Sequence, residues 1–396
     1  MFAVLPITRK VLTRLIALLS LLWVAACEPG GMAGMGGGAG QPIDPDGPVA
    51  VALLVPHGSS APGEAALARD LEAAARLAVA DLSGVQIDLR VYGTAGQPGQ
   101  AQQAALNAVS DGAKIIIGPL HAESANAVAV AVASKSVNVL AFSNNPTIAG
   151  GNLFVLGQTF DNTADRLTRY ASQQGKKRIV TVYSNNLAGQ LGQQAIAKAA
   201  ANAGAQIVGN VGYDFSQDGV VKAVPQVAQT VRSTSAQAVF LTANSAGALP
   251  LFAQMLPENG IDPAMTQYIG LARWDTPAQT LDLPGVQGGW FAMPDQGKAR
   301  AFQSRFAQRN GNQPHPIAGL AYDGIAAVGA LIKTGKRDAL SRSGLTQSAG
   351  FQGVDGVFRL RPDGTNQRGL AVATIRGGRV VILDPAPRGF GRGAGF

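Results

Sequence analysis

From Val49 onward the chain alternates short apolar runs with longer amphipathic stretches, and this alternation restricts its possible folds more than any other feature. Near-continuous apolar runs, as expected of strands buried on both faces, occur at 49–56, 85–92, 113–119 and 137–143. Stretches with apolar residues at helical spacing lie between them, at 63–82, 97–112 and 122–135. Successive units of this kind predict a parallel sheet with right-handed crossovers.

The same alternation then begins a second time. Helices are expected at 160–175, 187–204, 219–232 (which contains Pro225) and 246–256, and strands at 178–184, 205–213, 236–243 and 265–270. The sequence therefore predicts an α/β fold of two doubly wound parallel-sheet lobes. In such folds ligands bind at the carboxyl ends of the strands, in the cleft where the sheets meet.

The N-terminus has the layout of an export signal. Arg9, Lys10 and Arg14 precede an apolar run that ends in small residues and is short for a membrane span, which indicates a signal peptide over residues 1–26. The run ends Val-Ala-Ala-Cys and resembles a bacterial lipobox, in which Cys27 carries the lipid. Cys27 is the chain's only cysteine and cannot form an internal disulfide. The alternative is an ordinary signal with an incidental cysteine.

The residues after Cys27 are rich in glycine, and we expect 27–48 to be a flexible tether. In the sorting pattern that this leader resembles, Glu28 rather than Asp favours the outer membrane over the inner one. The expected location is therefore the periplasm, with a lipid anchor in the membrane. The C-terminal segment 385–396 is again rich in glycine and is expected to be disordered, with contact to an anionic surface as the alternative.

Composition and motifs argue against catalysis and nucleic-acid binding. The net charge of +8 is scattered, with no basic stripe interleaved with aromatic residues. The three histidines are far apart in the sequence, and the motifs of zinc proteases, nucleophile elbows, P-loops and dinucleotide sites are missing. We therefore expect no enzyme activity, no metal and no cofactor.

Several segments resemble the leucine-binding-protein family of type I periplasmic solute-binding proteins. The resemblance is carried by 118–125, 139–145, 288–294, 318–328 and, most specifically, the GFQGVDG…RPDG segment of 350–372. In that family the chain crosses between the lobes three times, which places crossings near Gly157, Gly270 and Gly350. By similarity the N-lobe comprises 49–157 plus 271–350, and the C-lobe comprises 158–270 plus 351–384. The late segment is then expected to form antiparallel strands, with turns at 363–364 and 377–378.

The candidate ligand-binding residues follow the strands of the predicted sheets. They are His57, Ser59, Ser60, His121, Glu123, Ser143, Asn144, Asn145, Thr147, Asn244 and Asp323. Their positions after strands, together with the family resemblance, suggest this role. For each the alternative is structural: a solvated loop, a helix cap, turn chemistry or, for Asp323, a residue that pins one lobe.

Two departures from the family pattern concern the ligand. Where the family commonly has an aromatic before the glycine that opens a C-lobe helix, this chain has Ala188 before Gly189. The loop at 244–247 lacks the carboxylate that often meets a ligand's ammonium. A buried ammonium without a negative partner costs several kcal/mol.

The sequence leaves two functions open. One is a regulator that resembles the penicillin-binding protein activators and contacts a peptidoglycan synthase. The alternative is a solute-binding protein that delivers a small polar ligand, such as an amino acid, to an ABC permease.

Overall fold

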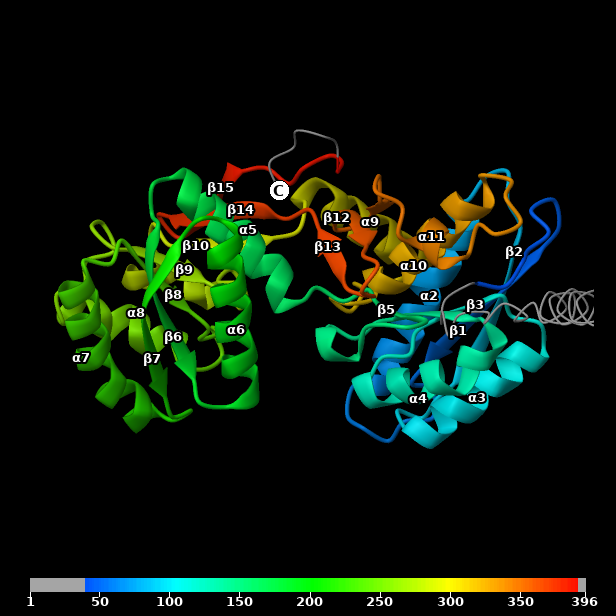
Figure 1. Ribbon diagram of the computed structural model, residues 1–396, viewed down its shortest axis with the longest axis horizontal. Coiled ribbons are helices and arrows are strands. Elements are labelled where there is room, and N and C mark those ends of the chain that lie inside the picture. The colour runs from blue at the N-terminus through cyan, green and yellow to red at the C-terminus, as the bar shows by residue number, and fades with distance from the viewer. Residues whose placement is uncertain (1–39, 391–396) are drawn as a thin grey trace, which may run out of the picture. The chain divides into compact units, whose positions relative to one another are not determined.

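The computed structural model describes residues 40–390, which form two α/β lobes joined by three stretches of chain (Figure 1). The predicted fold class is confirmed. The signal peptide, Cys27 and Glu28 lie outside the described residues. Within residues 40–390, each helix is too short or too polar to cross a bilayer.

The N-lobe is built on a five-stranded parallel sheet with the order β2-β1-β3-β4-β5. Its strands are β1 (Val49–Val55), β2 (Ile87–Gly93), β3 (Ile115–Ile117), β4 (Asn138–Ala141) and β5 (Leu153–Val155). Its helices are α2 (Glu64–Asp81), α3 (Pro98–Ser110), α4 (Ala122–Val132), α9 (Gln296–Asn310), α10 (Gly319–Ile332) and α11 (Arg342–Leu345). Helices α2 and α10 cover one face, and α3 and α4 cover the other. The sheet is buried on both faces, as the apolar runs predict.

The C-lobe is built on a seven-stranded sheet with the order β15-β14-β10-β9-β8-β6-β7. Its strands are β6 (Arg178–Ser184), β7 (Gln206–Tyr213), β8 (Ala238–Leu241), β9 (Gln267–Gly270), β10 (Trp290–Met293), β14 (Ala371–Arg376) and β15 (Arg379–Asp384). Its helices are α5 (Phe160–Gln173), α6 (Leu187–Asn202), α7 (Gln217–Thr234) and α8 (Leu249–Glu258). Helices α5 and α6 cover one face, and α7 and α8 cover the other. Helix α7 continues through Pro225, as predicted.

A small antiparallel sheet stands apart from both lobe sheets. Its strands are β11 (Phe351–Gly353), β12 (Gly356–Leu360) and β13 (Asn366–Arg368). Short 3-10 turns complete the chain at Ala133–Lys135, Pro146–Ile148, Ala278–Asp282 and Pro284–Val286. The antiparallel pairs β12–β13 and β14–β15 match the strands and turns expected for the late segment.

Two of the expected lobe boundaries are wrong. Strand β10 pairs with β9 and with β14, so 271–293 belongs to the C-lobe and the second crossing follows Met293 instead of Gly270. All four side chains of β10 are buried, which a strand at this place in the sheet requires. The small sheet instead packs its apolar residues into the N-lobe core, so 351–368 does not belong to the C-lobe. The third crossing lies at Gly369, between β13 and β14.

The expected tether extends too far along the chain. Ile43 is 3% exposed within the N-lobe core, and its backbone N–H donates to the carbonyl of Arg337 at 2.9 Å. A Cβ on Gly40 would lie 2.5 Å from the backbone of Ser341, so the chain already lies against the lobe there. One buried apolar side chain is enough to hold this short segment on the surface of the lobe.

The expectation of a disordered tail is wrong for residues 385–390. The ring of Phe390 lies 4.8 Å from the guanidinium of Arg359 on β12. The carbonyl of Arg388 accepts a hydrogen bond from Gln352 at 3.3 Å, and Pro387 lies close to Gly369. The tail therefore runs from β15 of the C-lobe back onto the small sheet, where aromatic, cationic and backbone contacts hold it.

We expect Phe390→Ala to lower the free energy of unfolding by about 1 kcal/mol, because it removes a cation–π contact and part of an apolar contact. Urea unfolding of the variant and the parent protein measures the difference. Phe215→Ala is the matched control, since Phe215 is 60% exposed and should leave stability nearly unchanged. Equal effects of the two substitutions would show that the tail contributes nothing.

Candidate functional site

A cavity of about 550 Å³ lies where the N-lobe loops, the crossings and the small sheet meet, and we call it the hinge cavity. Loops after β3 and β4, the crossings and the start of α10 supply its walls. It is lined by Leu67, Leu120, His121, Ala122, Phe142, Ser143, Asn144, Asn145, Gly157, Gln158, Arg273, Pro294, Pro316, Ile317, Leu320, Asp355 and Arg368. Cavities of this size, with apolar walls and a few polar groups, suit small-molecule ligands.

Four candidate residues from the sequence line this cavity: His121, Ser143, Asn144 and Asn145. The hydroxyl oxygen of Ser143 accepts from the backbone N–H of Asn145 at 3.1 Å, which leaves its proton available as a donor. His121 precedes α4, and its Nε2 lies 2.7 Å from Glu64 of α2. The role of these residues toward a ligand remains a prediction.

A second cavity of about 600 Å³ adjoins the same loop, and Thr147 lines it together with Asn144 and Asn145. Its other wall comes from the starts of α5 and α6 in the C-lobe. Phe160 and Leu187 lie on this wall, with 38% and 71% of their surface exposed. Lys198 and Asp161 form an ion pair of 3.0 Å at its edge. This wall offers mainly apolar contact.

Four other candidates line neither cavity. His57 is paired with Glu72 of α2 at 2.9 Å. Burial alone would raise the pKa of Glu72, but the contacts with His57 and Arg76 outweigh it and lower that pKa. The hydroxyl of Ser59 accepts from the backbone of Ala61 at 3.1 Å. Ser60 and Glu123 are exposed. These contacts fit the structural alternatives of a helix contact, a turn and a solvated surface, and a role of these four residues toward a ligand stays a prediction.

Asp323 and Asn244 also line neither of the two cavities. Asp323 on α10 is fully buried, where it accepts a hydrogen bond from the backbone of Val354 at 2.8 Å and one from Arg368 at 3.2 Å. It pins the small sheet to α10, which was the alternative expected for it. The backbone carbonyl of Asn244 accepts bonds from Gly247 and Leu249 in the loop after β8.

The most informative lining residues were missed at the sequence level: Gln158, Arg273, Asp355 and Arg368. Gln158 lies in the first crossing, Arg273 follows β9 of the C-lobe, and Asp355 and Arg368 belong to the small sheet. Their approach therefore depends on the arrangement of the whole chain. A partial signal was present, because Asp355 and Arg368 belong to the segment that resembled the family most closely. The glycines and the acid of that segment indicate the fold but do not indicate which side chains face a cavity.

The charged groups of the hinge cavity differ in how well they are paired. Arg368 donates from Nε and Nη2 to the carbonyl of Leu156, at 3.0 and 2.5 Å, in addition to its bond with Asp323. Arg273 forms a two-pronged pair with Asp275, at 2.9 and 2.5 Å. Within residues 40–390, no hydrogen bond or ion pair reaches the carboxylate oxygens of Asp355. Burial raises the pKa of Asp355, although both arginines oppose the shift.

The first crossing passes close beneath the loop after β4. A Cβ on Gly157 would lie 2.6 Å from the carbonyl oxygen of Ser143, so only glycine fits there without a shift. Gly157 also donates its backbone N–H to that carbonyl at 3.1 Å. This approach fixes the loop that carries Ser143, Asn144 and Asn145 against the crossing.

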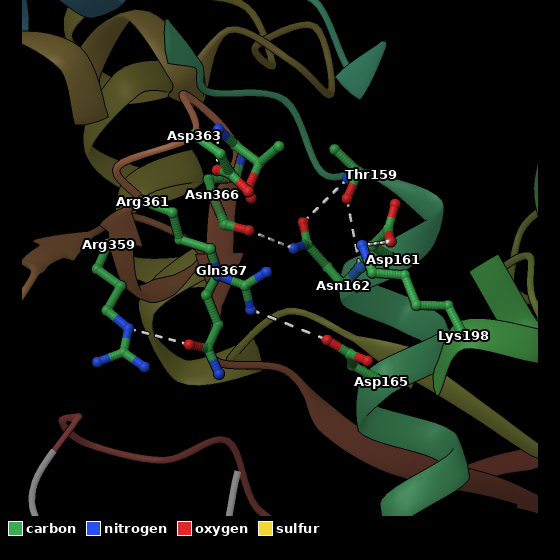
Figure 2. Close-up of polar contacts among 11 residues, drawn as sticks. Thr159, Asp161, Asn162, Asp165, Lys198, Arg359, Arg361, Asp363, Asn366 and Gln367 are labelled. Atoms are coloured by element: carbon green, nitrogen blue, oxygen red, sulfur yellow. Dashed lines mark hydrogen bonds and ion pairs between the residues drawn. The ribbon is translucent and has the colours of Figure 1, made fainter. Parts of the chain in front are cut away.

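The first and third crossings are tied to one another beside the cavity (Figure 2). The side-chain amide of Asn366 donates to the carbonyls of Val155 and Gly157, each at 2.8 Å. The backbone carbonyl of Asn366 accepts a hydrogen bond from the side chain of Asn162 at 3.0 Å. Thr159 and Asn162 form the capping box that starts α5. These bonds satisfy backbone groups that would otherwise be unpaired at the crossings.

Within the described residues 40–390, no group of three or more His, Cys, Asp or Glu side chains is placed to hold a metal ion. The hinge cavity instead offers hydroxyl, amide and carboxylate groups within apolar walls. This arrangement can bind a small polar molecule.

Comparison with known proteins gives one family match. The profile described as periplasmic binding protein matches residues 48–379. None of the curated proteins matches the chain significantly.

Three solved structures share the fold. A branched chain amino acid ABC transporter periplasmic ligand-binding protein from Burkholderia xenovorans LB400 is 18% identical, with a TM-score of 0.66 over 86% of this chain and 96% of that chain. A substrate-binding protein from Desulfitobacterium hafniense, in complex with Leu, is 17% identical, with a TM-score of 0.59 over 85% and 100%. A solute binding protein from R. palustris, in complex with benzoate, is 18% identical, with a TM-score of 0.54 over 88% and 99%.

The ionisation of Asp323 makes a testable contribution to stability. Burial raises its pKa from the ordinary value of 3.8 to about 6, although Arg368 opposes the shift. The folded chain then holds this proton more tightly than the unfolded chain does. The contribution of Asp323 to the free energy of unfolding is therefore full below pH 4 and is lost as the pH rises to about 6.

We compare the free energy of unfolding of the parent protein with that of Asp323→Asn. The value for the parent minus the value for the variant should fall between pH 4 and pH 6 and should be constant above that range. Urea unfolding of both proteins at several pH values measures this difference. The titratable groups that both proteins share contribute equally to the two free energies of unfolding, so their contributions cancel in the difference. A difference that stays flat or rises over the same interval would contradict the raised pKa.

Proposed function

The chain belongs to the periplasmic binding protein family, and on that basis we propose that it captures a small polar solute in the hinge cavity and presents it to an ABC permease. The observation that carries the proposal is the set of polar side chains in that cavity whose capacity to donate or accept hydrogen bonds is not fully used within residues 40–390. We propose a binding role without catalysis, in the periplasm. The regulator of peptidoglycan synthesis expected from the sequence is the less supported reading, because the family match and the named structures are of solute-binding type.

The hinge cavity offers both hydrogen-bond donors and hydrogen-bond acceptors to a ligand. Ser143 keeps a hydroxyl proton to donate. The amide nitrogen of Gln158 donates to Thr163 at 3.0 Å, so its carbonyl oxygen is left to accept. Asn144 is exposed, and no hydrogen bond of its side chain occurs within residues 40–390. A solute with both donor and acceptor groups can therefore replace the water that these groups would otherwise bind.

The apolar parts of the two cavities suit the remainder of such a solute. Phe142, Ile317 and Leu320 line the hinge cavity, and Phe160 and Leu187 line the second. The related structures were solved with Leu and with benzoate, which each combine a carboxylate with an apolar body. By analogy, we propose a ligand of similar size with one polar end.

The lipid anchor is a separate proposal, because Cys27 lies outside the described residues. We propose that Cys27 is acylated and holds the protein at the periplasmic face of a membrane, with Glu28 favouring the outer one. Metabolic labelling with a fatty acid should mark the parent protein and leave Cys27→Ser unmarked. Labelling of both proteins, or of neither, would contradict the proposal.

The binding proposal is tested by calorimetric titration and thermal unfolding of the full-length protein with amino acids, aromatic acids and small amines. A solute at 100 times its dissociation constant stabilises the fold by about 2.7 kcal/mol. Asn144→Ala should weaken binding by roughly tenfold, the value of about one hydrogen bond, without loss of stability. Asn202→Ala, at an exposed position near the end of α6, is the matched control.

The outcomes separate the two functions. A saturable heat that Asn144→Ala weakens supports solute capture at the hinge cavity. No binding of any solute class, together with binding of a purified peptidoglycan synthase, would overturn solute capture in favour of the regulator.

A further inference from the structure

Asp355 is the acid of the hinge cavity that lacks a partner, and it stands in the turn between β11 and β12. We propose that its carboxylate binds the cationic amine of the solute, so that the site selects ligands that carry an ammonium or amidinium group. This inference rests on the proposed solute-binding function. The loop at 244–247 contains no carboxylate that could meet a ligand's ammonium, and in this proposal Asp355 of the small sheet supplies one.

The first step of the argument is that the arginines of the cavity are already occupied. Arg368 is held by Asp323 and by the carbonyl of Leu156. Arg273 is held on two nitrogens by Asp275. Because each arginine has its own acid, neither offers a free positive charge to a ligand carboxylate. Asp355 is therefore the charge that remains without a direct counter-ion.

The second step concerns the cost of that charge. Asp355 is half-buried, and the pKa of its carboxyl is raised because burial outweighs the attraction of Arg368 and Arg273. A carboxylate kept from water without a hydrogen bond is unfavourable, and a bound cation removes that penalty. A bound ammonium therefore stabilises the ionised form of this carboxyl.

The third step is the geometry of the neighbouring groups. An ammonium has three N–H donors and needs more than one acceptor. The carbonyl oxygen of Gln158 lines the same cavity, and the bond from its nitrogen to Thr163 fixes which end of the amide is free. The exposed amide of Asn144 supplies another acceptor. Ser143, which donates, suits the opposite, oxygen-bearing end of a ligand.

The placement of Asp355 is rigid. Its backbone carbonyl accepts from the N–H of Asp295 at 2.9 Å, which ties the turn to the start of α9. The neighbouring Val354 donates to the buried carboxylate of Asp323 at 2.8 Å. These two bonds fix the backbone from which the carboxylate of Asp355 projects, and a fixed backbone reduces the cost of ordering the site for a ligand.

The test uses compounds that share one side chain: L-leucine, 3-methylbutylamine without the carboxylate, and 4-methylpentanoate without the amine. A second set is L-phenylalanine, 2-phenylethylamine and 3-phenylpropanoate. Each is titrated into the full-length protein and into Asp355→Asn, which keeps the shape of the side chain and removes its charge. Asp218→Asn is the control, because Asp218 is exposed on α7 and paired with Lys222.

We expect the amine-bearing compounds to bind the parent protein, and Asp355→Asn to weaken them at least thirtyfold, as for a lost charge-assisted bond. Asp218→Asn should change nothing. Thermal unfolding shows whether Asp355→Asn is folded, and Asp355→Glu, which keeps the charge, should retain part of the affinity.

Two results would overturn the inference. One is binding of the amine-free acids with an affinity equal to that of the amines, unchanged in Asp355→Asn, which leaves the proposed solute-binding function standing. The other is that no amine binds; the amine-free acids then show whether solute binding itself survives. Failure of every compound and every solute class of the wider titration would remove the proposed function as well.

Discussion

The buried pair of Arg368 and Asp323 is the interaction on which the arrangement at the hinge depends. Asp323 comes from α10 of the N-lobe, and Arg368 ends β13 one residue before the third crossing. The same guanidinium holds the carbonyl of Leu156 in the first crossing. Loss of either partner would leave an unpaired charge in the interior, a change that costs about 3–5 kcal/mol. The pair thus links one helix, the small sheet and two crossings.

The polar crossings raise a general problem for two-lobe proteins. Chain that leaves a sheet loses its ladder partners, and its backbone groups must find others. Here side chains of the small sheet and α5 supply them: Asn366 donates to the carbonyls of Val155 and Gly157, and Arg166 donates to the carbonyl of Leu370. Gly157 and Arg368 take part in such contacts and also line the hinge cavity, so the cavity and the crossings share one set of contacts.

The pattern of apolar residues determined the lobes. Strands such as β1 and β8 are apolar along their whole length, and burial on both faces requires helices on both sides. Helical spacing, glycine at helix ends and the order of the units were enough to predict most elements within a few residues. Strands β5 and β10 were not predicted. The three residues of β5 are too few to show a period, and the segment at 288–294 was noted only for its likeness to the family.

What the sequence by itself determined was therefore local and periodic: two α/β lobes, buried parallel strands, and polar loops at the carboxyl ends of strands, of which His121 and the residues at 143–147 do line cavities. What only the tertiary structure decided was which distant residues meet. The burial of Asp323 against Arg368, and the place of Asp355 in the lining of the hinge cavity, are visible only in the folded chain. The physical reason is that periodicity records the face on which a side chain is buried, whereas the pairing of charges depends on crossings that bring together residues far apart in the chain.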